Sequence, residues 1–361
     1  MAWLFAATVF ISAFLLFQIQ PMVGKYILPW FGSAPGVWSS SLMFFQLVLL
    51  AGYAYAHLLV SRLERRQQAI LHGILLALAL LVLPITPEEA LKPIGTENPS
   101  VRILLILSLS VGAPFFLLAA TAPLLQRWFA YLYPAQSPYR LYALSNFGSL
   151  LALLSYPFII EGLIRLQTQT WIWSFGFVVF AVLCVACGLQ LSRLQTGIKQ
   201  NSRAKETQTA EGQQSKVSAK TNVGIHCILT WLSLSACGSG LLMAITNQMS
   251  IDIASVPFLW VLSLSLYLLT FILCFESSRW YFSPLFALLL PVALINSLRL
   301  LYGAEEMGIV DQVLGYSLTL FVCCMCCHGE LARLRPDPER LTFFFLIVSL
   351  GGALGGMFVA I

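Results

Sequence analysis

The segment of residues 16–57 reads LFQIQPMVGKYILPWFGSAPGVWSSSLMFFQLVLLAGYAYAH. It contains two apolar runs, which predict two membrane helices joined by a short segment. At or near that segment lie Gln18, Gln20, Pro21, Lys25 and Pro29. Polar side chains and prolines at membrane depth are tolerated where they face a protein interior or a water-filled cavity. The stretch therefore predicts an internal, partly polar cavity.

The composition of the whole chain is that of a membrane protein. Of its 361 residues, 59% are hydrophobic and 10% are charged, whereas a soluble domain is about 25% charged. The first apolar run lacks a small-residue cleavage site, so we expect it to remain as a helix. We therefore expect an all-α, polytopic protein with the lipid bilayer as its surroundings and no nucleic-acid partner.

Apolar runs of roughly 17 to 25 residues predict about eleven transmembrane helices. The predicted spans are 3–20, 37–60, 68–86, 102–125, 141–162, 170–192, 223–246, 254–275, 281–300, 312–329 and 342–361. They divide into an N-terminal six-helix bundle, 1–192, and a C-terminal bundle of about five helices, 223–361. The polar residues 193–222 between them lack aromatics, and such a composition predicts a flexible cytoplasmic linker.

The basic residues indicate the orientation in the membrane. With the N-terminus inside, the cytoplasmic side receives 15 of the 20 Lys and Arg residues. The other five are Lys25, Lys92, Arg102, Arg165 and Arg299. The positive-inside rule therefore predicts a cytoplasmic N-terminus.

Short matches between the two bundles suggest an internal repeat. The matched pairs are PYRL at 138–141 with PERL at 338–341, SNFGS at 145–149 with SLGG at 349–352, and QIQ at 18–20 with TNQ at 246–248. Parallel repeats of this kind are those of the major-facilitator proteins, which bind solutes between their two halves. The pattern expects a twelfth helix, whereas the sequence stops at Ile361 within an apolar segment, so the chain is either short or a piece of something longer.

Several strings resemble a known family. They are FQIQP at 17–21 with Lys25, LPWFG at 28–32, PGVW at 35–38, FFQ at 44–46, GAPFFLLAATAPL at 112–124, LSNFGS at 144–149, VPFLWVL at 256–262 and CHGEL at 327–331. Together they resemble the membrane region of bacterial fused major-facilitator and spermidine-synthase-like proteins. The resemblance implies a bacterial inner-membrane protein. Longer relatives carry further helices and a cytosolic aminopropyltransferase-like domain that this sequence lacks, and the resemblance names no substrate.

Polar residues near helix ends or within spans are the candidates for a solute site. The uncharged amides are Gln18, Gln20, Gln46, Asn146, Asn247 and Gln248. They could line a cavity or form hydrogen bonds between helices, worth about 1 kcal/mol each. Lys25 and Asp252 follow the paired polar helix ends, so a gating ion pair between the halves is one hypothesis, and snorkelling of each charge to the surface is the other.

Cysteines near the end of the tenth span form the most distinctive local motif. Cys324, Cys327 and His328 match the pattern of covalent haem attachment, but the predicted topology places them on the cytoplasmic side, where that chemistry does not occur. The same ligands could bind Cu(I) or zinc, together with Cys184 and Cys187. Cysteine also packs well among apolar side chains. We therefore assign no metal and no cofactor.

The sequence shows no nucleotide-binding loop and no catalytic constellation in a soluble context, so we expect no enzymatic activity. The leading hypothesis is a transporter-like protein that binds or moves a small polar solute through a cavity between the bundles. The alternative is a membrane scaffold that anchors a separately encoded aminopropyltransferase-like enzyme or a larger membrane complex.

Overall fold

The computed structural model describes residues 2–31, 35–87, 91–93, 98–206, 224–253, 257–303 and 307–360. Within these ranges, eleven helical segments are long and apolar enough to cross a membrane. The helices that form them, in chain order, are α1 (Ala2–Phe31), α2 (Pro35–Arg62), α3 (Arg65–Ala79), α4 (Pro99–Leu107) with α5 (Ala113–Leu132), α6 (Tyr139–Ser155) with α7 (Glu161–Leu163), α8 (Leu166–Glu206), α9 (Ile225–Asp252), α10 (Pro257–Glu276), α11 (Ser283–Gly303), α12 (Ile309–Arg333) and α13 (Leu341–Ala360). The predicted polytopic helical architecture is confirmed.

The first helix differs from its prediction. The sequence predicts that it ends at residue 20, but α1 continues through Pro21 and Pro29 to Phe31. Proline removes one backbone hydrogen bond and usually breaks a helix in water. Within a bilayer, unwinding the segment would leave more backbone groups without hydrogen bonds, so the helical conformation is retained. Neighbouring helices make the prolines tolerable there. The buried side chains of Met22 and Ile27 beyond the first proline fit this explanation.

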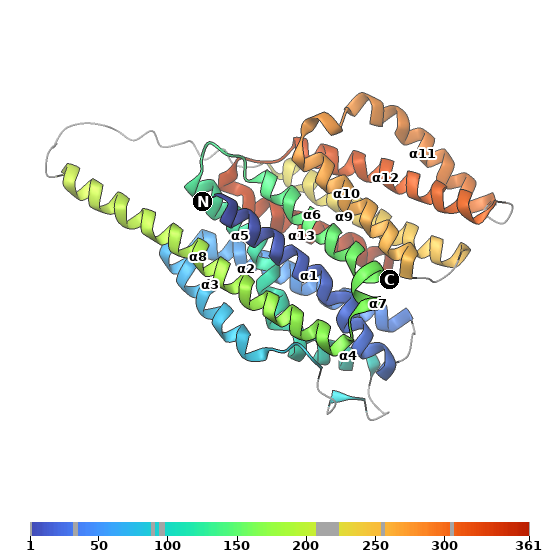
Figure 1. Ribbon diagram of the computed structural model, residues 1–361. Coiled ribbons are helices and arrows are strands. Elements are labelled where there is room, and N and C mark those ends of the chain that lie inside the picture. Colours follow the sequence, from blue (N-terminus) through green and yellow to red (C-terminus); the bar gives the residue numbers. More distant parts are fainter. Residues whose placement is uncertain are drawn as a thin grey trace.

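The connection between the two bundles also starts differently from its prediction. Helix α8 runs from Leu166 to Glu206, so residues 193–206 of the predicted linker are helical. Figure 1 shows the end of α8 extending well past the neighbouring helices. The remainder of the predicted linker, and the acidic loop residues Glu88, Glu89, Glu97, Glu305 and Glu306, lie outside the described residues.

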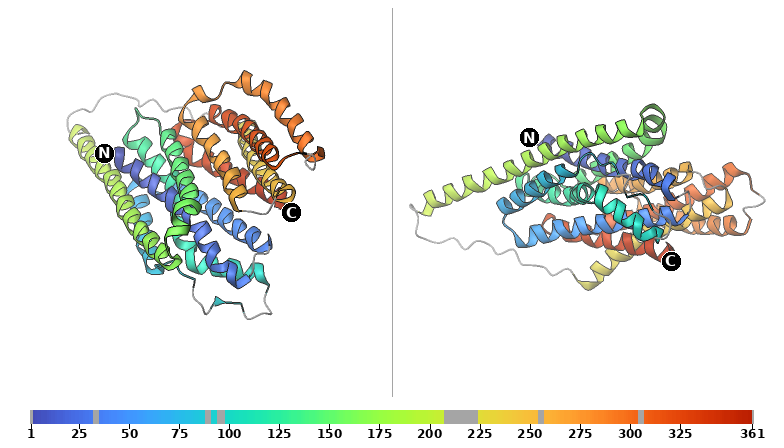
Figure 2. Two further views of the ribbon diagram at one scale, coloured as in Figure 1. Left: turned by 45° about the vertical axis from the view of Figure 1, so that its right-hand side comes forward. Right: turned by 90° about the horizontal axis from the view of Figure 1, so that it is seen from below.

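The two halves repeat one pattern of helix packing. In the first half, α1 packs against α6, and α2 against α5; in the second, α9 packs against α13, and α10 against α12. Across the boundary, α6 packs against α10 and α2 against α13. The contact of the first span with the fifth therefore corresponds to that of the seventh with the eleventh. Between the halves, the second span contacts the eleventh, and the fifth contacts the eighth. Figures 1 and 2 show the two groups of helices side by side.

Glycines allow the equivalent close crossings in the two halves. A Cβ atom on Gly148 of α6 would lie 2.8 Å from the main-chain oxygen of Phe10 in α1. In the second half, a Cβ on Gly351 of α13 would lie 2.5 Å from the oxygen of Leu232 in α9, and one on Gly355 would meet the backbone of α9 even more closely. Small residues permit such backbone approach between membrane helices. The Gly-containing strings that suggested the repeat therefore occupy matching helix crossings.

Candidate functional site

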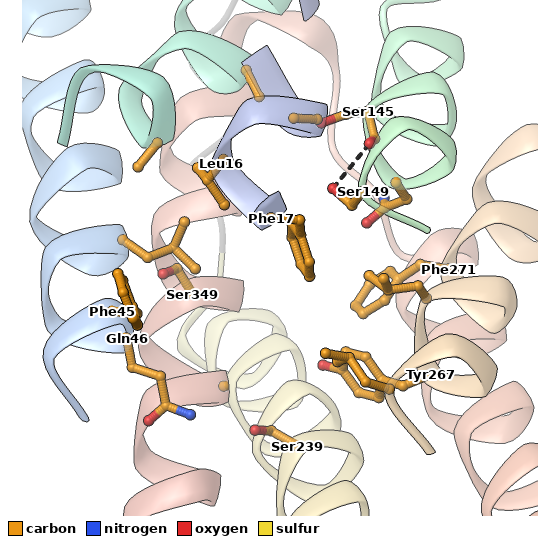
Figure 3. A pocket seen from close by; sticks show the side chains of 18 of the residues that line it. Leu16, Phe17, Phe45, Gln46, Ser145, Ser149, Ser239, Tyr267, Phe271 and Ser349 are labelled. Carbon is orange, nitrogen blue, oxygen red and sulfur yellow. Dashed lines mark hydrogen bonds between the residues drawn. The ribbon is translucent and has the colours of Figure 1, made fainter. Parts of the chain in front are cut away.

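A cavity of about 260 Å³ lies between the two halves. Its walls come from α1, α2, α5 and α6 of the first half and from α9, α10 and α13 of the second. Figure 3 shows side chains from these helices reaching into it. Because both halves supply the walls, any relative movement of the halves changes the shape of this cavity.

Three of the eight residues proposed from the sequence line the cavity. They are Gln20 on α1, Gln46 on α2 and Asn146 on α6. Asn146 uses its Nδ2 atom to donate a hydrogen bond of 3.0 Å to the main-chain oxygen of Tyr142. Its amide oxygen makes no hydrogen bond to another described residue and so remains an acceptor.

The other five candidates lie outside the cavity wall. Gln18 on α1 is half-buried, and Asn247 on α9 is exposed. Gln248 Nε2 donates a hydrogen bond of 2.9 Å to Asp252 Oδ1. Of the four amides at the ends of α1 and α9, only Gln20 therefore lines the cavity, because successive residues of a helix point to different faces.

The ion pair proposed between Lys25 and Asp252 is not present in this structure. Lys25 Nζ lies 2.6 Å from Glu161 Oε1, and both residues belong to the first half. Asp252 instead accepts hydrogen bonds from Gln248 and from the hydroxyl of Tyr316 on α12. Each charged group thus finds its partner within its own half.

Hydroxyl groups supply much of the polar lining, and the sequence reasoning missed them. The serines and tyrosines that line the cavity are Ser12, Tyr53, Tyr142, Ser145, Ser149, Ser235, Ser239, Tyr267 and Ser349. Several serines bond to nearby backbone; Ser235 Oγ, for example, donates to the main-chain oxygen of Val348 at 2.6 Å. The spacing of Ser145 with Ser149 and of Ser235 with Ser239 puts each pair on one helix face. This spacing of four residues is the sequence feature that could have identified the serines as part of a polar helix face.

The described residues that line the cavity include no Asp, Glu, Lys, Arg or His. The wall combines amide and hydroxyl groups with aromatic and aliphatic side chains, among them Phe17, Phe45, Trp260 and Phe271. The cavity is therefore electrically neutral, polar at some points and apolar at others.

Aromatic rings pack against one wall of the cavity where the halves meet. The ring of Tyr142 on α6 stacks on Phe345 of α13 with centroids 4.7 Å apart, and it meets the edge of Phe275 on α10 at 4.8 Å. Phe271 also packs against Tyr142. Tyr142 comes from the first half and its three partners from the second, so this cluster joins the halves.

Three hydrogen bonds between described residues join the halves beyond this aromatic cluster. Arg127 Nη1 donates to the main-chain oxygen of Pro338 at 2.6 Å, and the Tyr139 hydroxyl donates to that of Pro336 at 2.5 Å. A third bond, of 3.1 Å, joins His57 Nδ1 and Thr342 Oγ1. All three lie at the arginine-rich end, which we define as the end of the bundle holding Arg62, Arg65, Arg127 and Arg335.

A smaller space continues from the cavity away from the arginine-rich end. It has about 20 Å³, and its walls include Gln20 and Gly24 of α1, Leu42 of α2 and Trp260 of α10. A space of this size holds about one water molecule. Since α1 starts at the arginine-rich end, residues 20–27 lead toward the opposite end. The halves are therefore in contact at the arginine-rich end, and the space between them narrows toward the other end.

The cysteine motif does not form a metal site within the described residues, where no three His, Cys, Asp or Glu side chains are placed to hold an ion. His328 is fully buried. Its Nδ1 atom hydrogen-bonds Thr270 Oγ1 at 2.8 Å, and its ring stacks on Phe271. Cys324 and Cys327 are buried in the same helix, and Cys187 lies 3.5 Å from Thr8 Oγ1. These side chains take part in helix packing.

Comparison with solved structures identifies the fold. The structure of the proton:xylose symporter XylE bound to 6-bromo-6-deoxy-D-glucose matches with a TM-score of 0.61 at 15% sequence identity, over 99% of this chain and 87% of that one. A double-tryptophan mutant of XylE matches with a TM-score of 0.55, also at 15% identity, over 100% and 88% of the two chains. This is the major-facilitator fold. No protein-family model and no curated protein sequence matches the chain.

The major-facilitator fold explains the packing described above. In this fold two helical halves face each other, and in this chain the cavity with the neutral lining lies at the boundary between the halves. The described chain supplies eleven spans of this fold.

Proposed function

We propose that this chain is a carrier for a small polar solute, which it exposes alternately on the two sides of a bacterial inner membrane. The observation that carries the proposal is the cavity of about 260 Å³ whose walls are shared by both halves. Ligand sites of major-facilitator proteins lie at this boundary, and the solved relative XylE is a symporter for a sugar.

The contacts at the arginine-rich end support a mechanism of movement. Among the described residues, the contacts between the halves there include three hydrogen bonds, the guanidinium of Arg335 over the Tyr139 ring, and the aromatic cluster around Tyr142. Such contacts break and reform at modest cost, about 1 kcal/mol for a hydrogen bond and about 1.5–3 kcal/mol for one to a charged group. Separation of the halves at this end would open the cavity there, while approach of α1 to α10 would close the opposite end.

The proposed orientation of the protein in the membrane follows from the distribution of its basic residues. Under the positive-inside rule the arginine-rich end faces the cytoplasm, and the N-terminus lies on the same side because α1 starts there. The structure then corresponds to a carrier closed toward the cytoplasm.

Native mass spectrometry of the protein, mildly extracted from its membrane, tests this function. A carrier is recovered as the chain with a small polar molecule, and that molecule is lost when Gln46, which lines the cavity, is replaced by leucine. Recovery with an aminopropyltransferase-like or other protein subunit, and with no small molecule in either variant, would instead support the scaffold hypothesis.

A further inference from the structure

The charge of the cavity wall limits what can bind there. The described lining residues carry no ionisable acid or base other than tyrosine. Two charged residues proposed from the sequence, Lys25 and Asp252, lie outside the wall: Lys25 pairs with Glu161, and Asp252 accepts hydrogen bonds from Gln248 and Tyr316. A charged ligand entering this space would lose its hydration without gaining an opposite charge, which is strongly unfavourable in a medium of low dielectric.

Polar groups without partners lie on helices of both halves. The Gln46 amide on α2, the Ser239 hydroxyl on α9 and the Tyr267 hydroxyl on α10 line the cavity. In Figure 3 they reach into the lower part of the view. None of the three side chains hydrogen-bonds to another described residue. An amide and a hydroxyl each donate and accept, so together they complement hydroxyl or amide groups of a ligand.

The rest of the wall is suited to hydrocarbon. Phe17 of α1 and Phe271 of α10 present their rings to the cavity (Figure 3), and Leu16, Phe45 and Trp260 add further apolar surface. A ligand made of polar groups on every side would leave some of them facing these rings without hydrogen bonds, which is unfavourable.

The volume sets the size of the ligand. At about 260 Å³, the cavity is slightly smaller than pockets for drug-sized ligands, which start at about 300 Å³.

We infer that the ligand of this cavity is a small, uncharged molecule that carries hydroxyl or amide groups on one face and hydrocarbon on another. The inference rests on the proposed carrier function and narrows its substrate class. It excludes polyamines, the cations that the resemblance to spermidine-synthase-like proteins suggests, because the described part of the wall offers no carboxylate to bind an ammonium group.

Thermal unfolding of the purified full chain tests this substrate class. A metabolite extract of the cells that supply the protein is separated by ion exchange into neutral, cationic and anionic fractions, and spermidine serves as a defined cation. We expect the neutral fraction to raise the unfolding temperature, because a ligand that binds the folded state stabilises it. The cationic and anionic fractions and spermidine should leave it unchanged.

Variants connect this stabilisation to the cavity. Gln46→Leu and Tyr267→Phe each remove one group that can hydrogen-bond to the ligand, and each should weaken binding about five- to tenfold. The matched control is Gln18→Leu, which changes an amide outside the cavity wall and should bind as the wild type does. Tyr267→Phe retains the packing of the ring, so it distinguishes lost binding from lost folding.

Each outcome has one meaning. Stabilisation by a charged fraction or by spermidine overturns the inferred substrate class while leaving a carrier function in place. Stabilisation by the neutral fraction that is unaffected by both cavity variants overturns the assignment of the ligand to this cavity. Stabilisation by no fraction contradicts the carrier function itself.

Discussion

Arg127 on α5 and Pro338 before α13 connect the two halves of the molecule through one hydrogen bond, 2.6 Å from Nη1 to the main-chain oxygen. Arg127 is 8% exposed, and its guanidinium also lies over the ring of Tyr131, 4.2 Å from the centroid. Packing within the first half therefore holds the arginine in place, and its hydrogen bond reaches across the boundary. Under the proposed carrier function this bond would hold the arginine-rich end closed, and we refer to Arg127 in that role as the lock.

Loss of this lock should favour opening at the arginine-rich end. Arg127→Ala removes a charge-assisted hydrogen bond, which contributes about 1.5–3 kcal/mol, and should shift the balance between closed and open forms at least tenfold. We expect faster hydrogen exchange in the segment around Pro338 and Thr342. The control is Arg65→Ala, because Arg65 stacks on the same Tyr131 ring at 4.0 Å. Equal exchange in the two variants would contradict the proposed lock.

The crossing of α9 and α13 should tolerate no side chain at Gly355. A Cβ there would overlap the backbone of Ala236, so Gly355→Val must push the helices apart and should lower the free energy of unfolding by about 1–3 kcal/mol or more. Gly162 has no atom within 4 Å of a Cβ position, and Gly162→Val serves as the control. Unfolding in denaturing detergent measures both, and similar stabilities would rule out the close crossing.

Gln126 on α5 should be replaceable by an apolar residue with a gain in stability. It is fully buried, and neither its Nε2 nor its Oε1 atom has a hydrogen-bond partner among the residues that the structure describes. An unpaired buried amide is unfavourable by about 1–3 kcal/mol, so Gln126→Leu should raise the free energy of unfolding by about 1 kcal/mol.

The control for Gln126 is another buried glutamine, Gln68, whose side chain forms hydrogen bonds. Gln68 accepts from Trp128 Nε1 at 2.9 Å and donates to the main-chain oxygen of Leu63 at 2.9 Å. Gln68→Leu leaves the indole N–H unpaired and should destabilise the protein. The same unfolding measurement covers both variants, and destabilisation of similar size in the two would show that Gln126 has partners after all.

Lys25 should be coupled energetically to Glu161 and not to Asp252. The Lys25–Glu161 pair has side chains 36% and 40% exposed, and exposed pairs contribute about 0.2–1 kcal/mol. A double-mutant cycle of Lys25→Ala and Glu161→Ala should give a coupling energy in this range. The cycle with Asp252→Ala should give none. A larger coupling with Asp252 would restore the gating pair that the sequence suggested.

The sequence predicted the membrane spans because an apolar run long enough to cross the bilayer is rarely found in any other kind of structure. It ended α1 too early because Pro21 signals a helix end in water, and it ended α8 too early because residues 193–206 have the composition of a loop. Of the proposed site residues, Gln20, Gln46 and Asn146 reached the cavity wall. The others did not, because residue type alone does not say which face of a helix points inward.

The proposed alternating exposure of the cavity on the two sides of the membrane is tested by the accessibility of Ser349→Cys. Ser349 lines the cavity on α13, and wild-type protein gives the background from the nine native cysteines. A membrane-impermeant thiol reagent is added to right-side-out and to inside-out vesicles, each with and without Arg127→Ala. We expect reaction from both sides, with Arg127→Ala accelerating reaction from the side of the arginine-rich end. Reaction from one side alone, unchanged by Arg127→Ala, would contradict a carrier and indicate a static membrane scaffold.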